Sequence, residues 1–241
     1  MKKIIKMFEA GNVSVSGKRG RGKDMLFANV IARRRKMYIS NSDYKCRRAP
    51  YVRMDFSRLK TGNIYKNFLD NKVKKYIYPY PDGTDIYISD CGIYFPCQYN
   101  DRLNRDYEDI INFFALSRQL GECNVHTNAQ ALNRVWDKIR EQSDQYIVCR
   151  SCKVLFGFLV VQKVRIYEKY ESAVAEVAPF RCSIPLFAKS EVRSQVKMMR
   201  EKYRIEYGEI KSRTLIYVNR SRYDTRVFKR ILEVGNVEEN E

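Results

Sequence analysis

The segment Gly17-Lys-Arg-Gly-Arg-Gly-Lys-Asp24 constrains the fold of this chain more than any other feature. It matches the pattern GxxxxGK, in which glycines let the backbone wrap so that successive N–H groups point at phosphate oxygens. The short β-branched run 13–16 precedes it, and residues 23–36 follow without Pro or Gly. A buried strand and then a helix are expected on the two sides. The segment therefore predicts a phosphate-binding loop, and a glycine-rich basic turn is the less favoured alternative.

A helix that opens directly after such a loop adds its dipole and its free N–H groups to the binding of an anion. Lys23 supplies a point charge for the β- and γ-phosphates of a nucleoside triphosphate, which we expect to be ATP. The residues predicted to surround the phosphates are Gly17, Lys18, Arg19, Gly20, Arg21, Gly22, Lys23, Asp24 and Met25.

Two carboxylates are candidate ligands for Mg²⁺. Asp24 stands where such loops usually have Ser or Thr, and a carboxylate there can ligate Mg²⁺ or repel a phosphate. Asp90 ends the predicted strand 84–90, and ligands of parallel sheets lie at the carboxyl ends of strands. Cys91 occupies the next position, where many such ATPases have a Glu that polarises water. Lys23 and Asp90 are thus predicted catalytic residues, and no catalytic base is assigned.

Strand and helix patterns alternate through residue 150, which predicts an α/β fold with a central, mostly parallel sheet flanked by helices. We expect a P-loop ATPase domain over residues 1–180 and a small α+β extension over 181–241. Further strands are expected at 36–40, 52–56, 84–90, 123–127 and 213–218, a β-hairpin around Gly157 at 145–170, and helices at 103–120, 131–142, 188–203 and 223–232.

The net charge of +18 predicts attraction to a polyanion, either nucleic acid or an anionic membrane face. Nucleic acid is favoured over a merely solvated basic surface, because the basic residues are clustered. The seven cysteines are odd in number and follow no secretory signal, so we expect reduced thiols in a cytoplasmic protein. A zinc site at Cys149 and Cys152 is the less favoured alternative. The longest apolar run, 155–161, is too short to span a bilayer, which leaves a soluble or peripheral protein.

Several short motifs together resemble the Zonula occludens toxin-like family, the assembly ATPases of filamentous phages within the FtsK–HerA group of DNA-pumping motors. The motifs are the loop GKRGRGKD, the strand DIYISDCG, the helix end Arg118 to Gly121, the strand end with Thr127 and Gln130, the pair Ile139-Arg140, and Tyr223-Asp224-Thr225. Phage members of the family usually carry a transmembrane helix after the ATPase domain, and this chain has none. Peripheral contact with the inner face of the host membrane is the corresponding expectation.

The resemblance implies further roles for named residues. Gln130 or Asn128 would sense the γ-phosphate, and Arg118 and Arg140 are candidate arginine fingers supplied to the next subunit, although a surface role is commoner for arginine. The implied partners are DNA, other copies of the chain in a homo-oligomer such as a hexameric ring, and phage coat or assembly proteins. The expected function is ATP hydrolysis that drives packaging, translocation or virion assembly and export. A non-motor nucleic-acid-binding protein with a degenerate loop and a small-molecule kinase are the alternatives.

Overall fold

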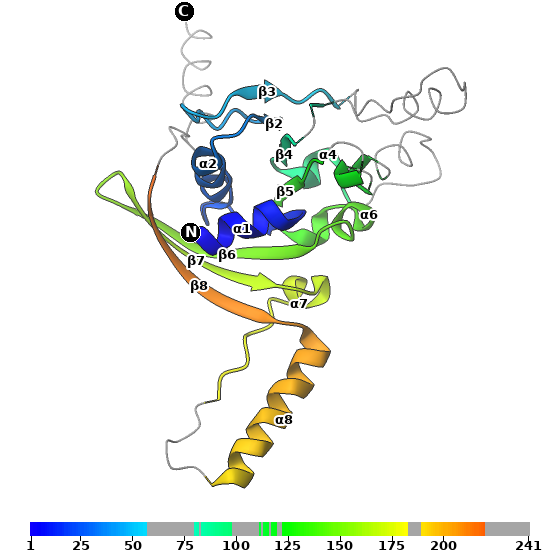
Figure 1. Ribbon diagram of the computed structural model, residues 1–241, viewed down its shortest axis with the longest axis vertical. Helices are drawn as coiled ribbons and strands as arrows, with labels where there is room; N and C mark the ends of the chain where they lie inside the picture. The colour runs from blue at the N-terminus through cyan, green and yellow to red at the C-terminus, as the bar shows by residue number, and fades with distance from the viewer. Residues whose placement is uncertain are drawn as a thin grey trace, which may run out of the picture.

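Three central strands of the structure are buried along their whole length, as expected of strands covered on both faces. The computed structural model describes residues 1–56, 80–97 except 82, 111–119 except 112 and 116, 122–182 and 189–219. Figure 1 shows the arrangement. The elements are α1 (Lys2–Ala10), β1 (Val13–Ser16), α2 (Lys23–Arg34), β2 (Tyr38–Ser40), β3 (Tyr51–Arg53), β4 (Asp85–Ile88), α4 (Cys91–Tyr94), β5 (Val125–Ala129), the 3-10 turn η2 (Leu132–Arg134), α6 (Asp137–Arg140), β6 (Gln145–Leu155), β7 (Leu159–Tyr167), α7 (Tyr170–Val174), α8 (Ser190–Tyr207) and β8 (Ile210–Val218).

Within the described ranges these strands form one sheet in the order β3-β2-β4-β5-β1-β6-β7-β8. All neighbours from β3 to β6 pair in parallel, whereas β7 and β8 extend the sheet with antiparallel pairs. The prediction of a mostly parallel sheet flanked by helices is confirmed. Because β5 lies between β1 and β4, the carboxyl ends of these three strands meet at one edge, where β1 enters the glycine-rich loop.

The core on the face covered by α1 and α2 is aromatic. The ring of Phe8 packs edge-on against Phe27 at 5.9 Å, and Phe27 packs against Tyr87 at 5.2 Å. His126 lies between Phe8 and Tyr87, and neither of its ring nitrogens has a hydrogen-bond partner. Burial lowers the pKa of His126 well below its ordinary value, so this side chain is a neutral packing residue.

The helix α1 has no counterpart among the sequence predictions. Its buried positions are Ile4 and Phe8, four residues apart, so they lie on one face of the helix. Three lysines and the apolar Ile5 and Met7 stand among the other positions, and this mixture obscures the helical periodicity in the sequence. Helix α2 is tied to β4 by an ion pair of 2.6 Å between Arg34 and Asp85, both nearly inaccessible to solvent. Burial raises the pKa of Asp85 to about 6, although Arg34 opposes the shift.

One other difference from the predictions concerns the boundaries of a helix. The helix predicted at 131–142 is divided into η2 and α6, because Val135 and Trp136 adopt extended backbone conformations between them. Val135 forms a bridge with Pro96, and the Trp136 N–H donates to the Phe95 carbonyl, so this stretch pairs with the segment after α4 instead of continuing a helix.

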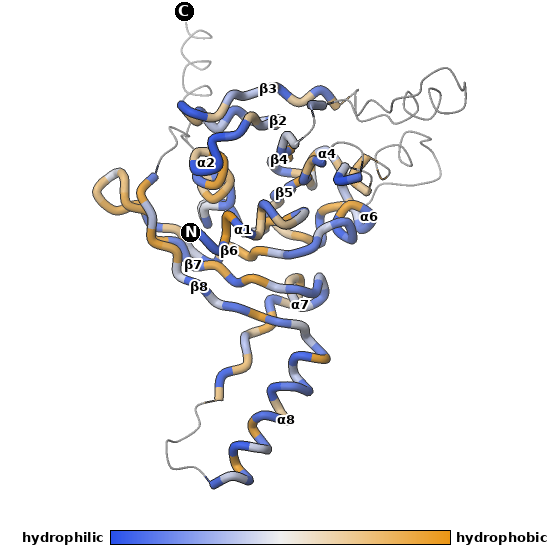
Figure 2. Tube along the Cα trace, in the orientation of Figure 1, coloured by the Kyte–Doolittle hydropathy of each residue, from blue (hydrophilic) through white to orange (hydrophobic). Residues whose placement is uncertain are grey.

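The predicted hairpin is present as β6 and β7, and the basic helix as α8. The strand beyond residue 180, β8, pairs with β7 over nine residues and so belongs to the same sheet, while the boundary at 180 stays a prediction. The predicted helix 223–232, the tripeptide 223–225 and most of the helix 103–120 lie outside the described residues. Hydropathy along the chain is shown in Figure 2.

Candidate nucleotide site

The glycine-rich segment forms a loop between β1 and α2 at the carboxyl edge of the sheet. Its first residue is anchored by a hydrogen bond of 3.2 Å from the Gly17 N–H to the Ala129 carbonyl at the end of β5. Inside the loop, the Arg21 N–H donates to the Lys18 carbonyl at 3.1 Å. Helix α2 begins at Lys23, and the first N–H groups of a helix have no partner inside it. The strand–loop–helix arrangement is as predicted, and it places these donors at the loop.

A second layer under the loop comes from β7 and β8. The amide of Gln162 donates to the carbonyls of Arg21 at 3.3 Å and Gly22 at 2.9 Å. The Tyr217 hydroxyl in turn donates to Gln162 Oε1 at 2.7 Å, and both side chains are buried. Neither Gln162 nor Tyr217 was predicted from the sequence. The available signal was a polar residue at an otherwise apolar, inward-facing position of the strand Leu159–Tyr167.

Close packing explains the glycine at position 22. Gly22 has φ 79°, in the left-handed region, and a Cβ atom there would lie 2.6 Å from Cys152 Sγ. The β-bulge between Cys149 and Ser151 lets Cys149 and Cys152 both contact the loop, although they are three residues apart in one strand. Burial raises the pKa of both thiols. No cluster of three or more potential metal-binding side chains occurs among the described residues, and the two thiols act as packing under the loop.

The Lys23 ammonium is held between two carboxylates. Its Nζ lies 3.0 Å from Asp24 Oδ2 and 2.8 Å from Asp90 Oδ1. The Lys23 side chain is 9% exposed, that of Asp24 16% and that of Asp90 39%. Burial by itself would lower the pKa of Lys23, but attraction to Asp24 and Asp90 outweighs it and raises that pKa. The predicted lysine and both predicted metal ligands thus meet in one place.

Side chains from β4 and β5 hold Asp24 in this position. Its Oδ1 accepts hydrogen bonds from Ser89 Oγ at 2.8 Å and from Asn128 Nδ2 at 2.9 Å. Asn128 Oδ1 accepts from the Asp90 N–H at 2.9 Å, so one amide contacts both carboxylate residues. Asn41, after β2, brackets Ser89 by accepting from its N–H at 2.7 Å and donating to its carbonyl at 2.9 Å. Ser89 and Asn41 were not singled out from the sequence.

The donor set suits Mg²⁺. Two carboxylates and the Ser89 hydroxyl are hard oxygen ligands, and Mg²⁺ in nucleotide sites typically takes one or two carboxylates together with phosphate oxygens and waters. Asp90 Oδ1 contacts Lys23 Nζ at 2.8 Å, so Lys23 and a cation would compete for this oxygen. When bound, Mg²⁺ would neutralise charge that develops on the transferred phosphoryl group.

Other predicted site residues lie elsewhere. Gln130 is exposed just beyond β5, while its alternative Asn128 lies in the network. Arg118 donates to the Ala10 carbonyl at 3.0 Å and contacts Asp144, next to the amino ends of β1 and β6. Arg140 donates to the Leu132 carbonyl and stacks over the Tyr170 ring at 4.5 Å. Their roles as arginine fingers stay predictions. Cys91 is fully buried, and burial raises its pKa, so it does not act as a base.

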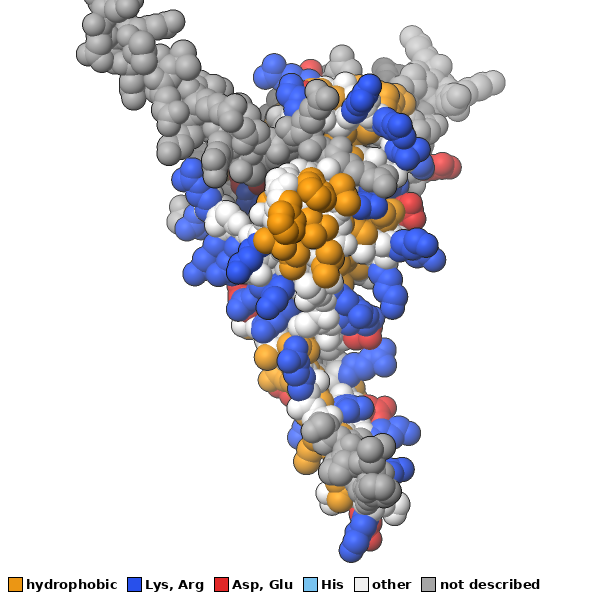
Figure 3. Space-filling model, turned by 90° about the vertical axis from the view of Figure 1, so that its left-hand side faces the viewer, with side chains coloured by type: hydrophobic (Ala, Val, Ile, Leu, Met, Phe, Trp, Pro, Cys, Tyr) orange, Lys and Arg blue, Asp and Glu red, His pale blue; other side chains and the backbone are white. Residues whose placement is uncertain are grey.

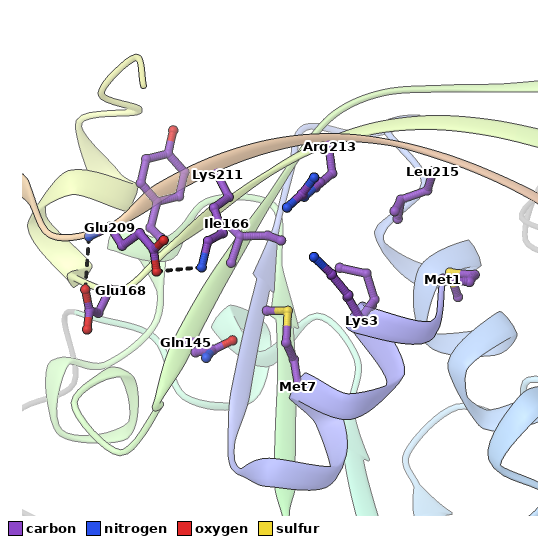
Figure 4. Close-up of a pocket in the computed structure, with 12 residues that line it drawn as sticks. Met1, Lys3, Met7, Gln145, Ile166, Glu168, Glu209, Lys211, Arg213 and Leu215 are labelled. Carbon is purple, nitrogen blue, oxygen red and sulfur yellow. Dashed lines mark hydrogen bonds and ion pairs between the residues drawn. The ribbon is translucent and has the colours of Figure 1, made fainter. Parts of the chain in front are cut away.

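A separate cavity of about 250 Å³ lies between α1 and the strands β7 and β8 (Figure 4). Its wall includes Gln145 at the start of β6. Lys3 on α1 and Arg213 on β8 both line it, and it shares no residue with the phosphate loop. It is therefore not part of the candidate nucleotide site.

The strand order, the loop between β1 and α2, and the convergence of Lys23 with Asp90 define a P-loop NTPase fold. Structures similar to this chain include the N-terminal domain of zonular occludens toxin from Neisseria meningitidis, with 12% identity over 91% of this chain and 97% of that one and a TM-score of 0.45. The genome packaging NTPase B204 of Sulfolobus turreted icosahedral virus 2 in complex with AMPPCP matches with 14% identity over 66% and 92% of the two chains and a TM-score of 0.41.

A third match, EssC (ATPases 2 and 3) from Geobacillus thermodenitrificans, has 10% identity over 83% of this chain and 45% of that one, with a TM-score of 0.40. The first match bears the name of the family that the sequence resembles. Neither a protein-family model nor a curated protein sequence matches the chain. The fold assignment rests on the chain's own topology and loop.

Proposed function

We propose that this chain is an ATPase whose hydrolysis of ATP drives packaging or translocation of phage-type DNA, or virion assembly and export. The observation that carries the proposal is the meeting of Lys23, Asp24 and Asp90 beside a glycine-rich loop and the first turn of α2. A buried lysine held by two carboxylates is in place to exchange them for phosphate oxygens. Asp24 and Asp90 would then be free to hold Mg²⁺.

We propose roles for the remaining side chains from their positions. Asn128 would orient a phosphate oxygen or the attacking water, because its amide already reaches Asp24 and the Asp90 N–H. Gln130 at the end of the same strand is the other candidate for this role. Arg118 and Arg140 would act only across an interface between copies of the chain, which requires the proposed homo-oligomer.

DNA is the proposed macromolecular partner. The end of α2 and the loop after β2 bring together three exposed arginines, Arg35, Arg47 and Arg48, around a hollow of about 380 Å³. None of them forms an ion pair within the part of the chain that the structure describes. Such a group suits phosphodiester oxygens, and it should give binding that weakens steeply with salt.

ATP turnover with and without single-stranded or duplex DNA tests the proposal. Wild type should hydrolyse ATP, DNA should stimulate it, and Lys23→Ala should abolish it. Lys197→Ala, a change of an exposed lysine on α8, is the matched control and should leave turnover unchanged. Turnover that needs a small acceptor molecule would favour a kinase instead.

DNA binding that is indifferent to ATP and to Lys23, with no turnover, would favour the non-enzymatic alternative. The observation that supports the non-enzymatic alternative is the buried Cys91 at the position where such ATPases have a general base. Replacing Arg35, Arg47 and Arg48 by Ala should reduce the dependence of log K on log salt by about 0.9 for each phosphate that is no longer neutralised. An unchanged salt dependence would remove this surface from the proposed DNA interface.

A further inference from the structure

The end of the β6–β7 hairpin carries an exposed apolar surface. Five side chains between 41% and 83% exposed make up what we call the hairpin surface: Leu155, Phe156, Phe158, Ile216 and Val218. Two distant parts of the sequence contribute to it, because β8 pairs with β7 up to the turn. Figure 2 shows the apolar colouring at this end of the hairpin, which projects past α2, and Figure 3 shows it face on as one orange patch.

Strand register makes the patch continuous. Leu155 pairs with Leu159, Leu159 pairs with Val218, and Val161 pairs with Ile216. Side chains of directly paired residues lie on the same face of a sheet. Leu215 and Tyr217, which alternate with Ile216 and Val218, are buried against the core on the other face. The apolar residues therefore cover the outer face of the sheet end, where no described element packs on them.

The turn itself is costly to the folded state. Phe156 has φ 52° and Gly157 has φ 72°, and the Phe158 N–H donates to the Leu155 carbonyl at 3.2 Å, which makes a four-residue β-turn inside the three-residue loop between Leu155 and Leu159. Both central positions of such a turn favour Asn, Asp or Gly. Here one is an 83% exposed Phe in the left-handed region, which is unfavourable for a bulky side chain. A strained and exposed aromatic residue at a loop tip indicates a contact outside the chain.

The charge around the hairpin surface indicates which kind of partner it contacts. Lys153 pairs with Val161 and Lys163 with Thr214, so two exposed lysines border the apolar face, and neither forms an ion pair within the described residues. Lys and Arg side chains also surround the patch in Figure 3. A second copy of this chain would bring the same positive charge against them, which is unfavourable. Nucleic acid would satisfy the lysines but not the three aliphatic side chains Leu155, Ile216 and Val218, because base stacking uses aromatic rings.

We propose that the hairpin surface binds an anionic lipid bilayer, with Phe156 and Phe158 entering the headgroup region and the lysines facing lipid headgroups. Apolar side chains at a membrane interface gain from burial in the acyl boundary, and flanking cations gain from the negative surface potential. No helix of the described ranges is long and apolar enough to cross a membrane, so contact of this kind would be peripheral. The proposal does not depend on ATP hydrolysis.

Co-sedimentation with vesicles tests the proposal directly. Vesicles of phosphatidylcholine with phosphatidylserine should bind wild type at least roughly tenfold more tightly than vesicles of phosphatidylcholine alone. The double variant Phe156→Asn, Phe158→Ser should lose at least roughly tenfold in affinity for the anionic vesicles. Because Asn suits the left-handed position, this variant should fold with unchanged or higher thermal stability. Met198→Ser with Ile205→Ser, on α8, is the matched control, since these side chains are 66% and 72% exposed, and should bind as wild type does.

Fluorescence locates the contact. Phe156→Trp adds an indole at the tip, while the natural Trp136 is only 3% exposed. Its emission should shift to the blue when anionic vesicles are added, and the emission of wild type should not. Absence of vesicle binding by wild type, equal loss in the α8 variant, or a tip indole that stays in water would overturn the proposal. A hairpin variant that instead lowers the oligomer mass or DNA affinity while vesicle binding persists would also overturn it, in favour of a second copy or nucleic acid.

Discussion

Because Lys23 pairs with two carboxylates, we predict that removing one carboxylate changes the free energy of unfolding in opposite directions with and without Lys23. Lys23→Met keeps most of the buried stem but removes the ammonium, so Asp24 and Asp90 are left facing each other without a cation. Breaking a buried pair typically costs about 3–5 kcal/mol. Because Asp90 is 39% exposed and water screens part of its charge, we expect a smaller loss of about 2–3 kcal/mol. For a chain of this length that corresponds to a fall in Tm of roughly 4–12 °C.

The sign of a second substitution should depend on residue 23. In wild type, Asp90→Asn takes a partner from Lys23 and should lower the free energy of unfolding. In the Lys23→Met background, the same change removes one of two like charges and should raise it. A thermal or urea double-mutant cycle measures this coupling, with Lys197→Met as a surface control. If Asp90→Asn has the same sign in both backgrounds, the three groups do not form the charge cluster described here.

Mg²⁺ should stabilise the Lys23→Met variant more than it stabilises wild type. In Lys23→Met the two carboxylates are free to bind the cation, and a ligand at about a hundred times its Kd stabilises the folded state by about 2.7 kcal/mol. Wild type without nucleotide should gain less, because Lys23 competes for the same oxygens. The measurement is Tm against Mg²⁺ concentration for wild type, Lys23→Met and Lys23→Met/Asp90→Asn. Equal stabilisation of all three would contradict a metal site at Asp24 and Asp90.

Three further predictions concern the loop and the core. Gly22→Ala should weaken nucleotide binding and lower Tm more than Gly20→Ala does. Both glycines have φ near 80°, but only Gly22 lacks room for a Cβ atom. Thermal unfolding and nucleotide titration of the two variants measure the difference. Tyr217→Phe should cost about 1–3 kcal/mol of unfolding free energy, since it leaves the buried Gln162 Oε1 without its donor, and urea unfolding would show no change if a solvent molecule replaced the hydroxyl. For Asp85, whose pKa is raised from 3.8 to about 6, the folded state retains the proton that the unfolded state has lost, so the stabilising contribution is full below about pH 4 and is lost as pH rises through 6. The unfolding free energy of wild type minus that of Asp85→Asn should therefore fall by about 1–3 kcal/mol between pH 4 and 7, and a flat difference would contradict the shift.

The sequence predicts well those parts of the structure that depend on local pattern. The strand before Gly17, the helix after Gly22 and the hairpin around Gly157 all follow from periodicity and turn residues in short windows. The helix at 131–142 was wrong, because extended backbone at Val135 and Trp136 pairs with a segment almost forty residues earlier. Pairing at that distance overrides helix propensity and leaves no local trace.

In the candidate site, too, some residues could be predicted from the sequence and others could not. Lys23, Asp24 and Asp90 carry recognisable motif positions, so their convergence could be anticipated from the rule that parallel strands end at one edge. Gln162 and Tyr217 could not, because their contribution depends on the antiparallel extension of the sheet bringing β7 and β8 under the loop. Their polar atoms act on backbone carbonyls, and no sequence pattern specifies such a partner.

Asp24, in place of the usual Ser or Thr, is better explained as part of a functional site than as a sign that the phosphate loop has lost its function. A carboxylate that had simply replaced a hydroxyl would be buried at 16% exposure without dedicated donors, which is costly. Instead Ser89 and Asn128, from two other strands, donate to the same oxygen, and Lys23 pairs with the other one. Ser89 supplies a hydroxyl beside the carboxylate that stands in the usual hydroxyl position. The same chemical groups are therefore present at the site, distributed over different strands, and this arrangement favours retained binding of a metal and nucleotide over a degenerate loop.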